Sequence, residues 1–275
     1  MPITCPIVAR SMSTAQFGEL DYRVMRHAFD SQNELGRLCD EQVYRNDLAA
    51  RLAAAGVGTV RMEVPITVRH RDFSKVYRMD LVLDDGAVYE LKANASLVPD
   101  HDAQLLNYLF LFGAARGKLV NFRPPQVEAR FVNNPLTTEA RSLTTADTTR
   151  WREPDAESAL LREIMTALLE DWGGFLDFAL YTEALTHFLG GEQRVLQPVP
   201  LCRNGIALGN QRLRLLNADT AFRVTALADE AEGYEPQLQA LLRHSPLRAI
   251  QWINLARHRV QYITLSNDPR RKAAE

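Results

Sequence analysis

The stretch YRMDLVLDDGAVYELK, residues 77–92, decides how the first half of the chain folds. Two apolar runs flank Asp84-Asp85-Gly86, a typical turn sequence, and this arrangement predicts a β-hairpin. If these three residues form the loop, Asp80 falls opposite Glu90 on the neighbouring strand. Directly opposed Cβ atoms lie about 4.5–5.5 Å apart in such a pair. The hairpin is therefore expected to hold two carboxylates side by side.

Paired carboxylates repel each other unless a cation lies between them, and oxygen ligands suit Mg²⁺ or Mn²⁺ better than zinc. Lys92 follows Glu90 by two residues, so both side chains should share one face of the strand. A divalent ion with a nearby lysine can activate water and neutralise charge at a phosphate. The alternative is an ordinary hairpin with a solvated polar face, since the D…E-x-K spacing is not specific. The apolar neighbours of Asp80 and Glu90 favour central strands, where unpaired charge is costly.

The bulk composition is that of an ordinary globular protein and neither indicates nor excludes nucleic acid. The chain has 275 residues, 46% of them hydrophobic and 24% charged, with a formal net charge of −2. The cysteines are scattered and suit a reducing compartment, and the apolar stretch at residues 105–115 is too short to span a bilayer. We therefore expect a cytoplasmic protein without a membrane partner.

The chain divides into two α/β modules. The first, residues 13–133, is expected to contain a helical pattern over 14–55 broken near 30–31, strands over 59–68, 76–83 and 87–93, a helix over 100–114, and strands over 118–122 and 127–132. A Thr-rich linker is expected over 134–152. The second module, residues 153–266, should begin with a helical pattern over 155–189 and end with a helix near 235–243 and strands over 249–255 and 260–265, before a polar tail over 267–275.

The two modules resemble each other in sequence, which indicates a tandem duplication. A shift of 133 positions places 104–108 on 237–241 and 119–122 on 252–255. The hairpin aligns at a shift of 134 and the first helices at 137. The alternative is two unrelated domains that share a helix–strand rhythm. At the hairpin positions the second copy has no charge pair but Arg214, Val224 and Ala226. Because the strand pattern persists without the acidic residues, we infer that the first copy keeps them for chemistry.

These residues together carry a family resemblance. With Glu34 on a helix, Asp80 and Glu90-x-Lys92 on a hairpin, and Gln104-x-x-x-Tyr108 on the next helix, residues 20–133 resemble the PD-(D/E)XK nuclease superfamily, in particular its RecB-like branch. The segments NELGRLCDEQVY, MDLVLDDGAVYELKA and QLLNYL look like bacterial proteins named for a GxxExxY pattern. Around Glu34 the chain departs from that pattern, since Ser31 takes the glycine position and Arg37 the tyrosine position.

The resemblance implies a restriction-endonuclease-like mixed sheet flanked by helices, duplicated in tandem with a degenerate second copy. It implies Mg²⁺ or Mn²⁺ held by Asp80, Glu90 and the backbone carbonyl of Leu91, with Glu34 as a ligand directly or through water. Lys92 would be the catalytic lysine. Gln104 and Tyr108, one helical turn apart, would position the metal site or contact nucleic acid, although a capping glutamine and a packed tyrosine are equally consistent with the sequence.

A basic cluster between two expected strands offers a surface for phosphates, although most such clusters are merely solvated. Its residues are Arg69, Arg71, Lys75 and Arg78. The sequence thus predicts a metal-dependent nuclease with an inactive second repeat, acting on DNA rather than RNA, as a monomer with an internal pseudo-dimer or as a homodimer. The alternatives are a non-catalytic nucleic-acid- or protein-binding module and a phosphoester hydrolase of small molecules.

Overall fold

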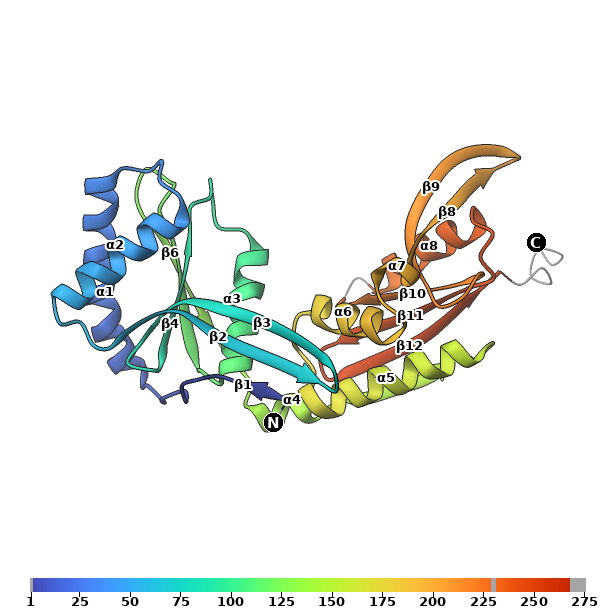
Figure 1. Cartoon of the computed structure of the whole chain (residues 1–275), viewed down its shortest axis with the longest axis horizontal. Coiled ribbons are helices and arrows are strands. Elements are labelled where there is room, and N and C mark those ends of the chain that lie inside the picture. The colour runs from blue at the N-terminus through green and yellow to red at the C-terminus, as the bar shows by residue number, and fades with distance from the viewer. Residues whose placement is uncertain (1, 229–230, 268–275) are drawn as a thin grey trace. The chain divides into compact units, whose positions relative to one another are not determined.

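The computed structural model describes residues 2–228 and 231–267 and divides into two compact units, Met1–Ala140 and Arg141–Glu275. Each unit is built on a six-stranded mixed sheet flanked by helices (Figure 1). This agrees with the mixed α/β class expected from the sequence. No helix within 2–228 or 231–267 has the length and apolar character needed to cross a membrane.

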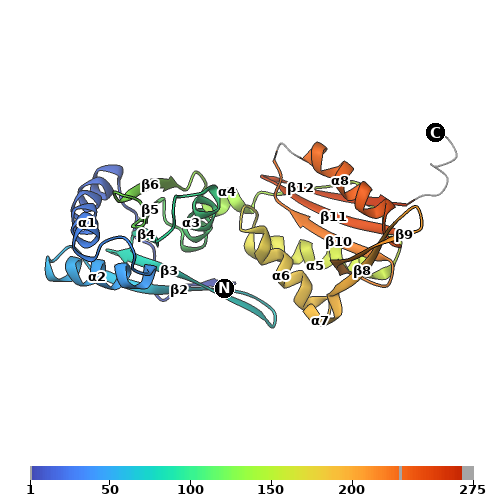
Figure 2. The same ribbon diagram turned by 90° about the horizontal axis from the view of Figure 1, so that it is seen from above.

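The sheet of the first unit runs in the order β1-β2-β3-β4-β5-β6, in which β4 and β5 are parallel and the other neighbours antiparallel. Helices α1 and α2 cover one face and α3 the other (Figure 2). The elements are β1 (Ile3–Thr4), α1 (Thr14–Leu35), α2 (Glu41–Ala54), β2 (Val60–His70), β3 (Phe73–Leu83), β4 (Ala87–Lys92), α3 (Pro99–Phe112), β5 (Arg116–Asn121) and β6 (Glu128–Asn133).

The break between α1 and α2 lies at Gly36, later than the break predicted near residues 30–31. Helix α1 starts at a capping box of Ser13 and Gln16 and runs to Leu35. Gly36 ends it with φ 73° and ψ −158°, a conformation that residues with a Cβ rarely adopt. The Tyr44 hydroxyl of α2 donates to the Gly36 carbonyl over 2.7 Å and fixes the corner between the two helices.

The core of the first unit sets the direction of the side chains on β4. Leu81, Leu83, Tyr89 and Leu91 are fully buried in the cluster formed with α1 and α2. Because successive side chains of a strand alternate between faces, the residue between Tyr89 and Leu91 points to the opposite face, which α3 covers. The apolar pattern of β4 thus turns its carboxylate towards α3.

The second unit has the sheet order β7-β12-β11-β10-β9-β8. Its elements are β7 (Thr145–Arg150), α5 (Ala156–Trp172), α6 (Phe178–Phe188), α7 (Glu192–Val195), β8 (Leu196–Arg203), β9 (Ile206–Leu215), β10 (Thr220–Thr225), α8 (Ala231–Arg243), β11 (Ala249–Ala256) and β12 (Arg259–Ser266). The stretch 134–152, predicted as a linker, instead contains α4 (Thr138–Ser142) and β7, and β7 pairs in parallel with β12. Of the predicted tail 267–275, residues 268–275 lie outside the described residues.

Apart from the short helix α7, the two units share one order of elements: two helices, three antiparallel strands, a helix, and two further strands, with β10 and β11 parallel like β4 and β5. Single contacts also recur. Tyr181 donates to the carbonyl of Gly173 over 2.5 Å, as Tyr44 does to Gly36. Asn121 donates to the carbonyl of Asn94 over 2.8 Å and Asn254 to that of Leu227 over 2.9 Å, a shift of 133 at both ends.

Strand pairing corrects the predicted alignment of the two hairpins by one residue. Glu90 pairs with Leu119, and Arg223 pairs with Trp252, the residue matched to Leu119 at a shift of 133. Arg223 therefore stands at the position of Glu90, and by the same register Thr225 matches Lys92 and Leu213 matches Asp80. The predicted matches Arg214, Val224 and Ala226 were each one residue too late. A shift of one residue in the alignment moves every side chain to the other face of the sheet. The sequence alone did not reveal this error, because both faces of these strands carry apolar residues.

Candidate active site

The β3–β4 hairpin has the register predicted from the sequence, and its pairing stops beside Asp80. Leu83 pairs with Ala87 and Leu81 with Tyr89, around the loop of residues 84–86. Beyond them, a carboxylate oxygen of Asp80 accepts a hydrogen bond from the backbone N–H of Leu91 over 2.8 Å. The Asp80 side chain thus replaces the next backbone hydrogen bond between the two strands. This bond holds the Asp80 carboxylate against β4, the strand that carries Glu90.

Pairing of β3 with β2 is interrupted at the same point. Met62 pairs with Leu81 and Val64 with Met79, but the residue between them, Glu63, has a φ of 50°. A positive φ is uncommon for a residue with a side chain and marks a local irregularity of the strand. Asp80 therefore lies where the hydrogen-bonding of β3 to both neighbours is irregular.

Glu90 is the centre of a buried polar network from β4 and α3. It is 3% exposed, and its Oε1 accepts from the Lys92 ammonium over 2.8 Å and from the Gln104 amide over 2.9 Å. The same amide donates to the Tyr108 hydroxyl over 3.0 Å. The structure thus brings together Glu90, Lys92, Gln104 and Tyr108, four of the five residues predicted as catalytic, with the fifth, Asp80, across the hairpin.

Burial and neighbouring negative charge dominate the electrostatics of this network. Burial, followed by the charge of Asp80, raises the pKa of Glu90 to about 8, although Lys92 acts in the opposite direction. Burial also raises the pKa of Tyr108 to about 12. The Oε2 atom of Glu90 is buried and has no hydrogen-bond partner within 2–228 and 231–267. A buried acceptor of this kind is costly unless a cation or water satisfies it.

Helix α2 adds two charged residues that the sequence interpretation missed. The Arg45 guanidinium donates to Asp80 over 2.8 Å and pairs with Glu63 over 2.5 Å. Burial raises the pKa of Glu41, with Lys92 and then Asp80 as the strongest charged influences, so this carboxyl lies within electrostatic reach of the hairpin. The sequence did contain a signal for Glu41. Glu41 and Tyr44 have the spacing of the E-x-x-Y part of the GxxExxY pattern, whereas Glu34 has no tyrosine at the corresponding position.

Glu34, predicted as a metal ligand, makes a different contact. Its carboxylate pairs with Arg51 over 2.7 Å, and its side chain is 69% exposed. Arg51 also pairs with Asp47 over 2.6 Å. These contacts give no support to the predicted role of Glu34, because they occupy it at the surface of α1 and α2 rather than beside Asp80.

The residues at the hairpin fit a hard divalent ion. Asp80, Glu90 and the Leu91 carbonyl offer oxygen donors, and one buried oxygen of Glu90 has no hydrogen-bond partner among the residues described. The described part of the chain contains no cluster of three or more His, Cys, Asp or Glu side chains placed to hold an ion. The backbone carbonyl and water would therefore have to complete the coordination, as is usual for Mg²⁺.

The predicted basic cluster lies on β2, β3 and their connection. Arg69, Arg71 and Arg78 are exposed, and Lys75 is partly buried with its ammonium 5.1 Å from the centre of the Tyr77 ring. The Tyr77 ring in turn lies edge-on to Tyr108, with 5.9 Å between the ring centres. Two aromatic rings thus connect the basic cluster with the network around Glu90.

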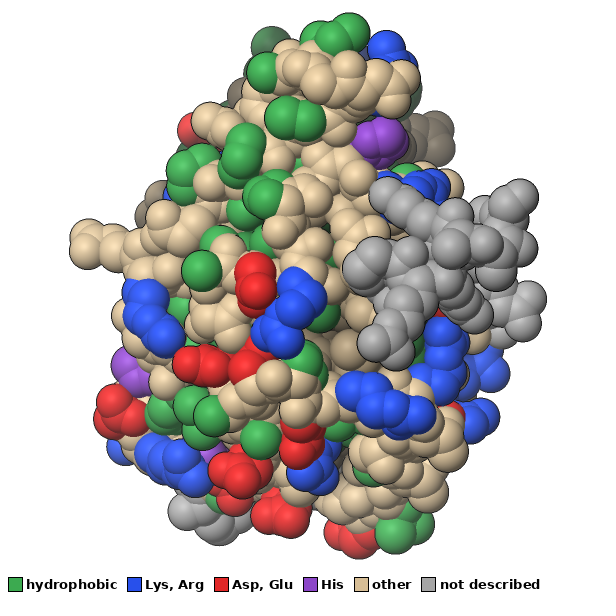
Figure 3. Space-filling view, turned by 90° about the vertical axis from the view of Figure 1, so that its right-hand side faces the viewer, with side chains coloured by type: hydrophobic (Ala, Val, Ile, Leu, Met, Phe, Trp, Pro, Cys, Tyr) green, Lys and Arg blue, Asp and Glu red, His purple; other side chains and the backbone are tan. Residues whose placement is uncertain are grey.

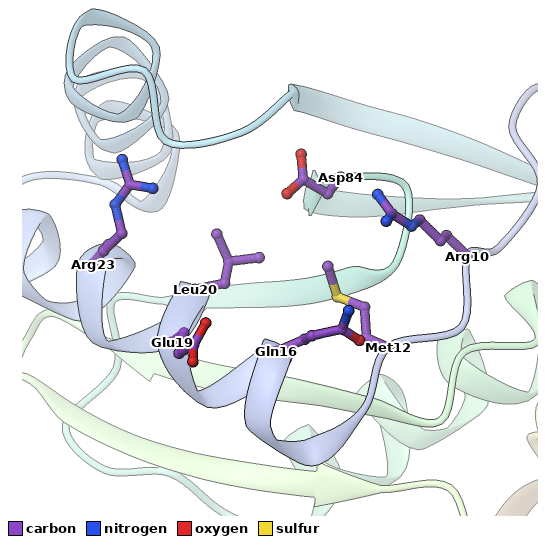
Figure 4. Close-up of a pocket in the computed structure, with 7 residues that line it drawn as sticks. All are labelled: Arg10, Met12, Gln16, Glu19, Leu20, Arg23 and Asp84. Carbon is purple, nitrogen blue, oxygen red and sulfur yellow. The ribbon is translucent and has the colours of Figure 1, made fainter.

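A separate cavity of about 280 Å³ lies beside α1, and Figure 4 shows its lining. The Asp84 carboxylate at its edge already accepts from the backbone N–H of Thr59 over 2.8 Å. Two arginines and two acidic residues line the cavity together, so its charge favours no ligand class. None of the residues drawn there was predicted as a site residue: Arg10, Met12, Gln16, Glu19, Leu20, Arg23 and Asp84.

Comparison with known proteins finds a family match for part of the chain. No curated protein matches the chain. The solved crystal structure of SSO0001 is 24% identical, covers 45% of this chain and 68% of that chain, and has a TM-score of 0.28, which is too low to carry any argument about fold. Residues 18–132, which contain the whole hairpin site, match the model of the PD-(D/E)XK nuclease superfamily.

Proposed function

We propose that the first unit is a metal-dependent nuclease that hydrolyses phosphodiester bonds of nucleic acid, with DNA preferred over RNA. The observation that carries the proposal is the buried cluster of Asp80, Glu90 and Lys92 at the point where strand pairing stops. The superfamily match over residues 18–132 supports the same chemistry. A surface basic cluster that includes Arg78 lies on the same strand as Asp80 and suits a polyanion.

The chain's own groups would divide the work as follows. Asp80, Glu90 and the Leu91 carbonyl would hold Mg²⁺ or Mn²⁺, and we assign the helix carboxylate to Glu41 rather than Glu34 because its electrostatic partners are Asp80 and Lys92. A bound divalent ion would supply Lewis acidity towards a phosphate oxygen and an attacking water. Lys92, held by Glu90, would orient the water or neutralise charge that develops on the phosphate.

Gln104, Tyr108 and Arg45 would act as positioning residues. The Gln104 amide fixes Glu90 Oε1 and the Tyr108 hydroxyl, and Arg45 fixes the Asp80 carboxylate. Groups held in this way reach the reacting phosphate without reorganisation, which is a main source of rate in phosphoryl transfer.

We further propose that the second unit is a tandem copy that has lost the chemistry. The shared order of elements, the two tyrosine–glycine contacts and the two asparagine contacts support a common origin. At the positions of Asp80, Glu90 and Lys92 it carries Leu213, Arg223 and Thr225, none of which can bind a divalent ion as an acidic ligand.

The second candidate function is a non-catalytic binding module on the same fold. The observation that favours it is the contact of Arg45 with Asp80, since a guanidinium already neutralises one of the two carboxylates. Such a module would bind nucleic acid or protein without cutting, so cleavage of nucleic acid separates the two candidates.

The test is cleavage of a panel of DNA and RNA substrates with Mg²⁺ or Mn²⁺. We expect Glu90→Gln and Lys92→Ala each to lower the cleavage rate by about 10²–10³-fold, with the thermal unfolding temperature measured alongside. Glu19→Gln, a change of an exposed carboxyl on α1, is the matched control and should cleave like wild type. A folded wild-type protein that cuts nothing in the panel, or a Glu90→Gln variant that cuts normally, would contradict the nuclease proposal.

A further inference from the structure

The β8–β9 hairpin of the second unit is a long ribbon without acidic residues. Its strands meet at Asn204-Gly205, whose φ values of 51° and 79° suit the two-residue turn of a twisted hairpin. Between Glu192 and Asp219 the sequence has no acidic residue but four arginines: Arg194, Arg203, Arg212 and Arg214. The charge of such a segment is complementary to a polyanion.

Much of this ribbon is open to solvent. The first seven residues of β9 are exposed, and Ile206 and Leu208 near the tip are 61% and 54% exposed. Figure 1 shows the two strands curving away from the rest of their sheet. At the upper end of Figure 3, where this hairpin lies, the side chains drawn are mostly hydrophobic or uncharged, and most acidic side chains of that view lie lower.

A cavity of about 300 Å³ lies at the base of the ribbon, between β9, β10 and α8. Its polar lining is cationic or neutral and includes Arg212, Arg214, Arg223, Tyr234 and Gln237. The Arg223 Nε donates to the Tyr234 hydroxyl over 2.9 Å, which aims the guanidinium towards α8. Among residues 2–228 and 231–267, no carboxylate lies within ion-pair distance of Arg212, Arg214 or Arg223.

The like charges of this cavity affect one another. Burial and then the charge of Arg223 lower the pKa of Arg214, although Glu192 and Glu183 act in the opposite direction. An anion near these guanidinium groups would reduce this repulsion, and phosphate is the anion whose geometry a guanidinium matches with two hydrogen bonds.

The position of the cavity in the fold is informative. Arg223 takes the place that Glu90 has in the first unit, and Gln237 takes the place of Gln104. The first unit therefore gathers negative charge where a cation would hold a phosphate. The second unit has a guanidinium there, which can contact a phosphate directly.

We propose that the β8–β9 hairpin and the cavity at its base form a non-catalytic binding site for the phosphate backbone of duplex DNA. A two-stranded ribbon fits the width of a DNA groove, and Arg212 and Arg223 at its base contact backbone phosphates. The site deepens the proposed nuclease function, on which its choice of nucleic acid rests, by adding a contact to the substrate from the second unit.

The experiment is binding of a short fluorescent DNA duplex to the full chain in EDTA, followed by anisotropy over a range of salt concentrations. We expect Arg212→Ala with Arg223→Ala to weaken binding by at least about tenfold and to reduce the slope of log K against log salt by about two. The matched control is Arg162→Ala with Arg259→Ala, which removes the same charge from exposed ion pairs of the same unit. It should leave the affinity within about twofold.

Other outcomes separate this site from its rivals. Arg212→Lys with Arg223→Lys should recover part of the affinity, which a folding defect would not allow. Three results would overturn the proposal. In the first, the wild-type chain shows no binding to the duplex. In the second, the double alanine variant binds like its control. In the third, the hairpin instead joins two chains into a dimer whose formation leaves DNA binding unaffected. Because the assay contains no metal, it measures binding without cleavage, so loss of cleavage in the nuclease assay and loss of binding at this site are distinguishable.

Discussion

At the scale of single residues, the two oxygens of Glu90 have different surroundings. Oε1 accepts from Lys92 and Gln104, whereas Oε2 is buried without a hydrogen-bond partner among the residues described. Two donors fix the orientation of the carboxylate and leave its second oxygen for another group. An isolated polar residue on a strand surface would have no reason to be held so firmly.

Substitution of Glu41 and substitution of Glu34 should have different effects on the rate of metal-dependent cleavage. We expect Glu41→Gln to lower metal-dependent cleavage by about 10–100-fold, because this carboxyl lies within electrostatic reach of Asp80 and Lys92. Glu34→Gln should stay within about twofold of wild type, because it loses only an exposed ion pair with Arg51. Cleavage rates of the two variants over a range of Mg²⁺ concentrations measure this, and equal losses would refute the reassignment.

The site residues that the sequence could predict are those related by local periodicity. Alternation along β4 joins Glu90 to Lys92, one helical turn joins Gln104 to Tyr108, and the turn length places Asp80 across the hairpin. Glu41 and Arg45 escaped because the face of α2 that meets the hairpin depends on tertiary packing. A wrong helix break near residues 30–31 made it harder still to locate that face.

At the scale of elements, the start of α5 shows how one carboxylate can join several segments. Asp155 caps the helix by accepting from the Ser158 backbone N–H over 2.8 Å. It also accepts from the Thr220 hydroxyl over 3.1 Å and from Arg248 over 2.9 Å. The cap therefore links α5 with β10 and with the segment before β11.

Removal of this cap should weaken the protein in a pH-dependent way. Burial alone would raise the pKa of Asp155, but hydrogen bonds from Ser158 and Thr220 among others outweigh it and lower the pKa below 3.8. A lowered folded-state pKa contributes stability above the unfolded pKa and loses it as pH falls through the folded value. We expect Asp155→Ala to cost about 1–2 kcal/mol at neutral pH and less below about pH 4.

Urea unfolding at neutral and acidic pH measures this difference, with Glu163→Ala, an exposed change on the same helix, as the control. A stability gap that stays constant, or grows, as the pH falls below the unfolded value would contradict the assignment of the charge.

Most elements of the first unit followed from periodicity, and those that did not depend on distant partners. The hairpin, α3, β5 and β6 lie close to their predicted ranges. Strand β7 was missed because its threonine-rich sequence resembles a loop until its pairing with β12, more than a hundred residues later, is known. Likewise the alignment of the second hairpin depended on the register of β10 against β11, which local sequence does not contain.

At the scale of the whole molecule, the two units carry opposite charge at positions that strand pairing matches. The first has Glu90 beneath α3, and the second has Arg223 beneath α8. The contacts kept in both, from tyrosine to glycine and from asparagine to backbone, belong to the framework. If the units are copies, we expect the residues that differ at matched positions to account for what each unit does.

Magnesium should consequently slow hydrogen exchange in the first unit and not in the second. A ligand that binds only the folded first unit stabilises it by mass action. Hydrogen exchange with and without Mg²⁺ should therefore slow in β3, β4 and α2 and leave β9 and β10 unchanged. Glu90→Gln should abolish the effect. Protection of β9 and β10 that equals or exceeds that of β3 and β4 would disprove the division of charge between the units.

The contact of Arg45 with Asp80 also bears on how the protein is made. A pair of buried carboxylates without a counter-ion would oppose folding until an ion arrived. Arg45 supplies positive charge from the chain itself, as Lys92 does beside Glu90. A newly synthesised chain can therefore complete its hairpin before it meets a metal, and purification in a chelator should yield a folded protein. We therefore expect folding to precede the binding of any metal ion.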